Sequence, residues 1–282
     1  MKILITGSSG QLGQALQKAL RHHELFAADR RELDIRNLDA ARSLLDRFSA
    51  DWIVNAAAYN FVDRAESEPE AAEAVNSSGA ANLARAAAER KAALVHVSTD
   101  YVFDGLSARP YVESDEPHPL SVYGWSKLKG EREAAAGNPR HLIVRTAWLF
   151  SAAGHNFAKT ILGLGLKGDV RVVSDQVGCP TYVPHLAEAI AGLMERGAQG
   201  LYHLAGSGQA SWYEFARTLF EEMEIPSKVT PIASSDYPQA AKRPKFSVLA
   251  SARQPEVRLP AWQEGVRAFA RELQDRKERF QP

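Results

Sequence analysis

The stretch Ile3-Leu4-Ile5-Thr6-Gly7-Ser8-Ser9-Gly10-Gln11-Leu12-Gly13 decides the fold of this chain. Its three aliphatic residues predict a short buried strand, its glycines a tight turn, and the Ala-, Leu- and Gln-rich segment that follows a helix. Glycines let such a turn approach a pyrophosphate closely, and free amides at the helix start point toward it. Strand, glycine turn and helix in this order form the context of a dinucleotide site, although an ordinary connector is the alternative. We expect the following residues to bind a dinucleotide cofactor: Gly7, Gly10, Gln11, Leu12 and Gly13.

Apolar runs that alternate with helix-forming segments extend this pattern along the chain. The expected strands cover residues 3–5, 25–28, 34–35, 52–55, 94–97 and 141–145. Such alternation predicts an α/β fold with a Rossmann-type doubly wound parallel sheet and a smaller α/β substrate-binding lobe. We expect residues 1–148 to form the dinucleotide-binding domain and residues 182–210 to return to it. Residues 149–181 and 211–282 then make up most of the substrate-binding lobe.

The end of the second expected strand carries conflicting signals about the cofactor. Asp29 lies 22 residues past Gly7, where an acidic side chain binds the ribose hydroxyls of NAD. Arg30 or Arg31 can instead hold the 2'-phosphate of NADP, unless both are solvated surface arginines. We expect NADPH or NADH to be used, with a slight preference for NADPH because two guanidinium groups are available.

Two further segments are expected to contact the cofactor. Asp34 and Ile35 end the next short strand and would lie near the adenine. Ala56, Ala57 and Ala58 follow the strand at residues 52–55. Their small side chains let the ribose and the nicotinamide lie against the backbone.

A helix is expected to begin at Ser121, which suits the N-cap, and to run to the Gly-Asn-Pro stop at residues 137–139. Tyr123 and Lys127 then lie one turn apart on the same face. A free phenol has a pKa of about 10, and an ammonium group beside it favours the phenolate. The pair is therefore a candidate acid and base, and a chance pair on a solvated helix face is the alternative.

The composition excludes several classes of function. The 282 residues carry no net charge, which gives no indication of binding to nucleic acid or to an anionic membrane surface. No segment approaches the roughly 20 apolar residues of a membrane span. The lone Cys179 precludes an internal disulfide, so we expect a soluble protein in the reducing cytoplasm. The 8 histidines show no metal-ligand spacing, so we expect no metal.

Several motifs together resemble one family. Ser98-Thr99-Asp100 follows an apolar run, and a Ser or Thr combined with the Tyr-Lys pair and the glycine turn is similar to the extended short-chain dehydrogenase/reductases. Within that family, the chain resembles the dTDP-4-dehydrorhamnose reductase branch. The motifs that carry this likeness are Asn55-Ala56-Ala57-Ala58-Tyr59, Val62-Asp63, Ser98-Thr99-Asp100-Tyr101-Val102-Phe103-Asp104-Gly105, Tyr123-Gly124-Trp125-Ser126-Lys127, Arg145-Thr146-Ala147-Trp148, Asn156-Phe157, Asp175-Gln176-x-Gly178-x-Pro180-Thr181, Ser211-Trp212-Tyr213-Glu214-Phe215 and Arg243-Pro244.

The resemblance implies that Thr99, Tyr123 and Lys127 are the catalytic residues. In the implied reaction, hydride passes from NADPH or NADH to C4 of dTDP-4-dehydro-L-rhamnose and yields dTDP-L-rhamnose. Tyr123 would protonate the developing alkoxide, Thr99 would donate a hydrogen bond to the same oxygen, and Lys127 would bind the nicotinamide ribose. Related 4,6-dehydratases carry a Glu where this chain has Tyr101, which favours simple reduction over elimination.

The resemblance also suggests contacts with a dTDP-sugar substrate. It implies that the substrate is bound by Thr99, Asp100, Tyr101, Phe103, Trp148 and Arg243. The aromatic rings of Tyr101, Phe103 and Trp148 could pack on the deoxysugar or the base, and core packing is their alternative. Arg243 could pair with the nucleotide diphosphate, and a surface ion pair is its alternative.

Two positions depart from the family pattern. Asn60 stands where a Thr is common, so the pocket near the nicotinamide is expected to differ. Ala15 stands where some members carry a metal-binding Glu, so we expect no metal-bridged dimer, and the sequence does not set the number of subunits.

Two other functions stay open. One is a reductase of a related dTDP-4-keto-deoxysugar. The other is a non-catalytic nucleotide-binding regulatory subunit, similar to the methionine adenosyltransferase beta subunit. The intact triad argues against the second, because a pure binding module has no need of Tyr123 beside Lys127.

Overall fold

The computed structural model describes residues 1–254 and 256–278. A six-stranded sheet with the order β10-β5-β4-β3-β1-β2 forms its centre, and every pairing in it is parallel. Its strands are β1 (Lys2–Thr6), β2 (Glu24–Ala28), β3 (Trp52–Asn55), β4 (Ala93–Thr99), β5 (His141–Thr146) and β10 (Gly200–His203). This sheet confirms the expected doubly wound α/β class. Of the expected substrate lobe, residue 255 and residues 279–282 lie outside the described part.

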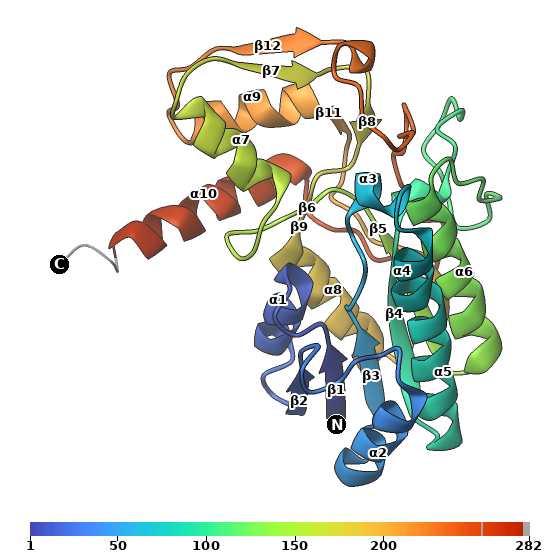
Figure 1. The fold of residues 1–282 in the computed structure, drawn as a ribbon. Coiled ribbons are helices and arrows are strands. Elements are labelled where there is room, and N and C mark those ends of the chain that lie inside the picture. The colour runs from blue at the N-terminus through green and yellow to red at the C-terminus, as the bar shows by residue number, and fades with distance from the viewer. Residues whose placement is uncertain (255, 279–282) are drawn as a thin grey trace.

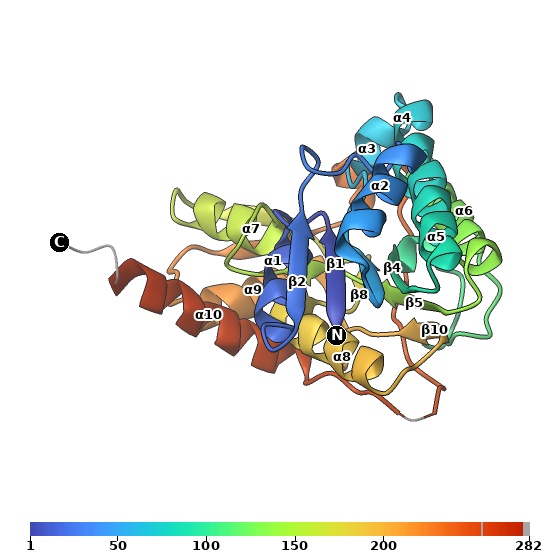
Figure 2. The same cartoon turned by 90° about the horizontal axis from the view of Figure 1, so that it is seen from below.

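Helices cover both faces of the sheet (Figure 2). On one face, α1 (Gln11–Ala19) packs beside α8 (Val183–Glu195), and the two share an apolar core with the strands. The other face is covered by α2 (Leu38–Phe48), α5 (Gly79–Glu89) and α6 (Val122–Gly137). Buried Leu, Ile and Ala side chains fill the space between these helices and the sheet. None of these or the other described helices is long and apolar enough to cross a membrane.

The strand expected at residues 34–35 is not formed, so this prediction was wrong. Ile35 is buried, but it packs against the backbone of Gly79 in α5 instead of pairing with a neighbouring strand. The Asn82 side chain donates to the carbonyl oxygens of Ile35 and Arg36 at 3.1 and 2.9 Å. Those carbonyls therefore find partners without a sheet, and the segment remains a turn that leads into α2.

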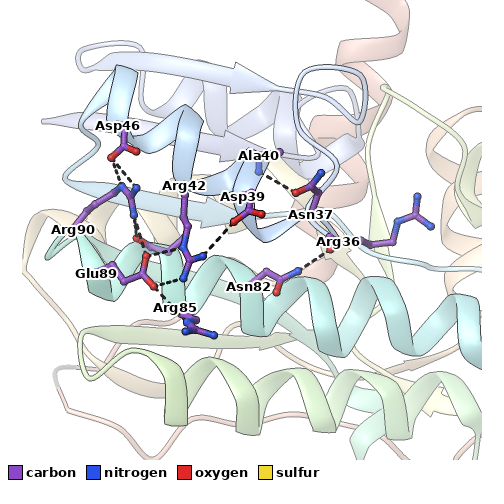
Figure 3. Close-up of polar contacts among 11 residues, drawn as sticks. Arg36, Asn37, Asp39, Ala40, Arg42, Asp46, Asn82, Arg85, Glu89 and Arg90 are labelled. Carbon is purple, nitrogen blue, oxygen red and sulfur yellow. Dashed lines mark hydrogen bonds and ion pairs between the residues drawn. The ribbon is translucent and has the colours of Figure 1, made fainter.

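Exposed ion pairs join α2 to α5 on the outer surface (Figure 3). Arg42 contacts Glu89 at 2.6 Å, and Arg90 contacts Asp46 at 2.7 Å. The hydrogen bond from Arg42 is the main reason that the pKa of Glu89 falls to about 2. Because exposed pairs of this kind contribute little each, the apolar core beneath them supplies most of the stability of this layer.

A second layer lies beyond the carboxyl ends of the central strands (Figure 1). Its elements are β6 (Leu149–Phe150), α7 (Phe157–Gly165), β7 (Val170–Val173), β8 (Val177–Gly178), β9 (Thr181–Tyr182), β11 (Ala210–Ser211), α9 (Trp212–Glu222), β12 (Val229–Ile232), a 3-10 turn (Ser234–Asp236) and α10 (Trp262–Glu278). Phe150, Phe215 and Phe269 form the centre of its own apolar core. The carboxyl edge of a parallel sheet is where ligands bind in such folds, so the second layer closes over the expected site.

Candidate active site

A cleft of about 380 Å³ separates the carboxyl edge of the sheet from the second layer. It brings together many of the residues expected from the sequence. The expected residues that line it are Gly10, Gln11, Leu12, Ala56, Ala57, Ala58, Thr99, Asp100, Tyr101, Tyr123, Lys127 and Trp148. Asn60, which the sequence placed near the nicotinamide pocket, lines it too. Thr146 and Trp212 also line it, and the sequence had not assigned them to the site.

The glycine turn packs its backbone against the loop that follows β3. Gly7 has a φ of +66°, and a Cβ there would approach the amide nitrogen of Ala57 to 2.7 Å. A Cβ on Gly13 would overlap the carbonyl oxygen of Gly7. The first and last glycines therefore permit the close packing of the turn, while Gly10 borders the cleft at the start of α1.

Gln11 connects the turn to the second layer. Its side-chain oxygen accepts hydrogen bonds of 2.9 Å from Ser151 and from Asn156. The side chain is thus already engaged by protein groups, while the residue as a whole lines the cleft. This contact fixes the start of α1 relative to the far wall of the cleft.

The residues expected near the adenosine lie outside the cleft. The Asp29 carboxylate accepts from the backbone amide of Arg31 at 2.6 Å, and this hydrogen bond is the main cause that lowers its pKa. Asp34 pairs with Arg36 at 2.5 Å instead. Arg30 and Arg31 are exposed and form no ion pair with any described residue. Two guanidinium groups are therefore available beside the end of β2.

Tyr123 and Lys127 project from the first two turns of α6. Ser121 caps the helix by accepting from the Gly124 amide at 3.1 Å, as its sequence position predicts. Both side chains are buried at the cleft. The Lys127 Nζ donates to the carbonyl oxygen of Val97 at 2.6 Å, and the Tyr123 hydroxyl donates to Asn60 Oδ1 at 3.4 Å.

The expected lowering of the phenol pKa by the ammonium is not found in this structure. Burial raises the pKa of Tyr123 above its usual value, and the nearby Thr99 hydroxyl offsets part of that rise. Burial also lowers the pKa of Lys127 to about 8, against a smaller opposing effect of Glu131. Desolvation disfavours both charged forms, so in the protein alone the phenol is held as a proton donor.

Thr99 ends β4 beside this pair. Its hydroxyl donates to Asp100 Oδ1 at 3.1 Å, and the Ser247 hydroxyl donates to Asp100 Oδ2 at 2.6 Å. Asp100 is almost fully buried, and burial raises its pKa to about 7. The Tyr101 ring lies edge-on to the Tyr123 ring, with a centroid distance of 5.8 Å.

Phe103 does not reach the cleft. It is fully buried and stacks on Tyr111 at a centroid distance of 4.1 Å. The Arg145 guanidinium lies over its ring, with 5.1 Å from Cζ to the centroid. Contact with a substrate is therefore the wrong assignment for this aromatic, and core packing is the right one.

Trp148 forms a wall of the cleft together with Trp212 from α9. The two indoles stack at 3.4 Å with an angle of 3° between the rings. Trp148 has a φ of +45°, an uncommon value for a residue with a side chain. Gly178 leaves the space that the ring occupies, because a Cβ there would lie 2.5 Å from it. The stack joins the sheet to the second layer.

Arg243 borders a second cavity of about 390 Å³, which shares Tyr101 and Trp212 with the cleft. Its guanidinium contacts both carboxylate oxygens of Asp63, at 3.0 and 2.7 Å. Asp63 lies in the short helix α3 (Val62–Ala65), so this pair also ties the second layer to the sheet. The carboxylate occupies part of the hydrogen-bonding capacity expected for a diphosphate.

Asn76 was not assigned to the site from the sequence, where it interrupts the helical pattern expected over residues 70–75 and 80–88. It lies in a π-helical turn (Ala74–Ser78) between α4 (Pro69–Glu73) and α5. Its side-chain oxygen accepts from the Tyr59 amide at 2.8 Å. Its side-chain nitrogen donates to the Tyr59 carbonyl oxygen at 3.0 Å and to the Ser126 hydroxyl at 2.9 Å. It thereby fixes the loop after β3 against α6. The interrupted helix pattern was the available signal, because π-turns often mark functional sites.

Comparison with known proteins agrees with this geometry. The family model described as RmlD substrate binding domain matches residues 1–275. The dTDP-4-dehydrorhamnose reductase of Aggregatibacter actinomycetemcomitans is 43% identical over 264 residues, which cover 88% of this chain and 90% of that protein.

Two solved structures superpose closely on the chain. A dTDP-4-dehydrorhamnose reductase from Clostridium acetobutylicum is 40% identical with a TM-score of 0.94, and the match covers 97% of this chain and 100% of that one. The Bacillus anthracis dTDP-4-dehydrorhamnose reductase, solved in complex with NADP, is 36% identical with a TM-score of 0.94 and coverage of 96% and 99%. This chain therefore belongs to the RmlD substrate binding domain family, together with proteins named dTDP-4-dehydrorhamnose reductase.

Proposed function

We propose that this protein reduces the C4 keto group of dTDP-4-dehydro-L-rhamnose to give dTDP-L-rhamnose, with NADPH or NADH as the reductant. One observation carries the proposal: Thr99, Tyr123 and Lys127 line the same cleft as the glycine turn at the start of α1. The relatives named above, one of them solved with NADP, support the same activity.

The residues around the cleft fit a nicotinamide dinucleotide. Gly7 and Gly13 allow the turn to pack closely on itself and on the loop after β3. The start of α1 offers free amides to a pyrophosphate. Ala56, Ala57 and Ala58 present only small side chains where the ribose and nicotinamide would lie. The bound cofactor supplies hydride to C4 of the sugar.

Residues of this chain supply the proton to the sugar oxygen at C4 and stabilise the negative charge that develops on it. As the C4 carbonyl becomes an alkoxide, Tyr123 gives its proton to that oxygen, and Thr99 donates a hydrogen bond to it. Lys127 holds the nicotinamide ribose with its ammonium group. Tyr101 occupies the position where elimination would need a carboxylate base, so the C5 proton has no acceptor there.

The substrate would lie between the sheet and the second layer. Tyr101, Trp148 and Arg243 border the cleft or the cavity joined to it, which supports their assignment to substrate binding. The proposed domain division follows the same line, with residues 1–148 and 182–210 assigned to the dinucleotide-binding domain and residues 149–181 and 211–282 to most of the substrate-binding lobe. The buried free thiol of Cys179 supports a cytoplasmic location.

The test is oxidation of NADPH and of NADH with enzymatically prepared dTDP-4-dehydro-L-rhamnose. Tyr123→Phe should lower kcat by about a hundredfold or more with little change in cofactor affinity, because one proton donor is lost and the shape is kept. Tyr202→Phe, a buried tyrosine in β10 outside the cleft, is the matched control and should keep its rate. An absence of turnover with both cofactors would overturn the proposal, and faster turnover of a related dTDP-4-keto-deoxysugar would change its substrate.

A further inference from the structure

A buried ion pair lies directly behind the three active residues. Arg145 in β5 contacts Glu131 in α6 through two hydrogen bonds, of 2.9 Å from Nε and 2.7 Å from Nη2. Their side chains are only 4% and 6% exposed. Removing two charges from water is costly, and apolar side chains of similar volume often stabilise a core equally well. The position of this pair suggests a role besides stability.

The Ser98 hydroxyl adds a third hydrogen bond to the same carboxylate, at 2.5 Å from Glu131 Oε1. Ser98, Glu131 and Arg145 are called the Glu131 network below. Each member lies close to an active residue along its own element. Ser98 directly precedes Thr99 and pairs in register with Arg145 across β4 and β5. Glu131 lies one helical turn after Lys127 in α6.

The Glu131 network therefore joins helix α6 to strands β4 and β5, and the reaction depends on how this helix is placed against the sheet. Thr99 belongs to β4 and Tyr123 belongs to α6, yet both must reach the same substrate oxygen. Apolar packing between a helix and a sheet has no directional preference, whereas charge-assisted hydrogen bonds set distances and orientations. A helix displaced by about 1 Å can cost a hundredfold in rate.

We propose that Glu131 is a positioning residue, which acts through Ser98 and Arg145 to set the distance between the Thr99 and Tyr123 hydroxyls. This inference rests on the proposed function, because it concerns the same triad. It adds a residue that touches neither substrate nor cofactor, and it assigns a purpose to the buried charges.

Ser98→Ala is the decisive variant. It removes one hydrogen bond and leaves the buried Arg145 paired, whereas Glu131→Gln would leave an uncompensated charge and endanger folding. We expect kcat to fall about tenfold, with the KM of sugar and cofactor within about twofold. The kinetic isotope effect from NADPH deuterated at the transferred position should rise, because hydride transfer becomes more rate-limiting. Ser98→Thr keeps a hydroxyl and should recover most of the rate.

Ser251→Ala is the matched control. Ser251 donates to Glu113 at 2.5 Å, so this variant also loses a serine-to-glutamate hydrogen bond, but outside the cleft. It should lower Tm as Ser98→Ala does and leave kcat and the isotope effect unchanged. Equal kinetics for the two variants would show that the Glu131 network only stabilises the fold.

A crystal structure of Ser98→Ala tests the inference without any substrate. The separation of the Thr99 and Tyr123 hydroxyls should change by about 0.5 Å, the tolerance of a preorganised site. An unchanged separation would overturn the positioning role, whatever the activity. Failure of the wild-type protein to turn over the sugar, with the separation changed in the variant, would instead reject the proposed function alone.

Discussion

The Tyr123 hydroxyl donates a hydrogen bond of 3.4 Å to the side-chain oxygen of Asn60. Tyr123 lies in the first turn of α6 and Asn60 lies in the loop after β3, so this contact joins the helix to that loop. At 3.4 Å the bond is long, which leaves the phenol free to turn toward a substrate oxygen. The amide would then hold the phenol ready between turnovers.

Asn60→Ala is predicted to lower kcat about fivefold, which is the effect of losing one hydrogen bond worth roughly 1 kcal/mol. Steady-state kinetics with the keto sugar measure it. Phe61→Ala is the control, because Phe61 is the next residue, and its side chain is exposed and does not line the cleft. An unchanged kcat in Asn60→Ala would mean that Asn60 does not orient the phenol.

A second prediction follows from the pKa of about 8 at Lys127. Burial disfavours the ammonium, so in the free protein Lys127 loses its proton as the pH rises through about 8. The titratable groups that interact electrostatically with Lys127 are Glu131 on the same helix and His96 in β4. Burial keeps the pKa of His96 well below its usual value. His96 is therefore neutral throughout this range.

If the ammonium holds the ribose, cofactor affinity should weaken by up to tenfold per pH unit above about pH 8. Fluorescence titration with NADH between pH 6.5 and 9.5 measures this, because NADH has no 2'-phosphate that titrates. Lys127→Met should bind NADH more weakly, with an affinity that does not vary over this range. A wild-type affinity that is constant up to pH 9.5 would contradict the role of the charge.

The sequence predicted the parts of the site that depend on local pattern. The glycine turn follows from a strand, glycines and a helix in order, and the facing of Tyr123 and Lys127 follows from helical spacing. The strand expected at residues 34–35 was wrong because a branched apolar residue such as Ile35 suits both a strand and a buried turn. The contacts that decide between the two come from Gly79 and Asn82, which are distant in the chain. Local pattern contains no information about such partners.

The prediction of a lowered pKa for Tyr123 failed for a related reason. The sequence suggested that Lys127 would lower the pKa of Tyr123, but burial is the main cause at both groups and raises the pKa of Tyr123 while it lowers that of Lys127. Burial depends on the whole fold, including the second layer. The stacking of Trp148 on Trp212 is a similar case, because its two residues are far apart in the sequence.

The third prediction concerns the choice of cofactor. Arg30 and Arg31 are exposed and form no ion pair with described residues, so they are free to bind a 2'-phosphate. Replacing both by Ala should weaken NADPH binding by about tenfold or more and change NADH binding little, because charge-assisted pairs to phosphate are lost. Arg42→Ala, which removes an arginine paired with Glu89, is the control. Equal losses for NADPH and NADH would remove these arginines from cofactor selection.

The last prediction concerns Asp100, whose pKa burial raises from 3.8 to about 7. Between about pH 4 and 7 the folded protein binds a proton at this site that the unfolded chain has released, so stability falls as the pH rises through that range. Above pH 7 the folded protein holds a buried carboxylate at full cost.

Asp100→Asn cannot ionise, and its amide can still bond the Thr99 and Ser247 hydroxyls. The stability of this variant relative to the wild type should therefore increase between pH 5 and pH 8. The increase should be on the order of 2 kcal/mol in unfolding free energy, and the difference in Tm should rise with it. Asp104→Asn is a control of opposite sign. The Leu106 amide donates to Asp104 and lowers its pKa, so removing that charge should cost stability at pH 8 and little near pH 3. Thermal unfolding of the three proteins between pH 3 and pH 8 measures both effects. Parallel curves for Asp100→Asn and the wild type between pH 5 and pH 8 would show that Asp100 is ionised in the fold at no cost.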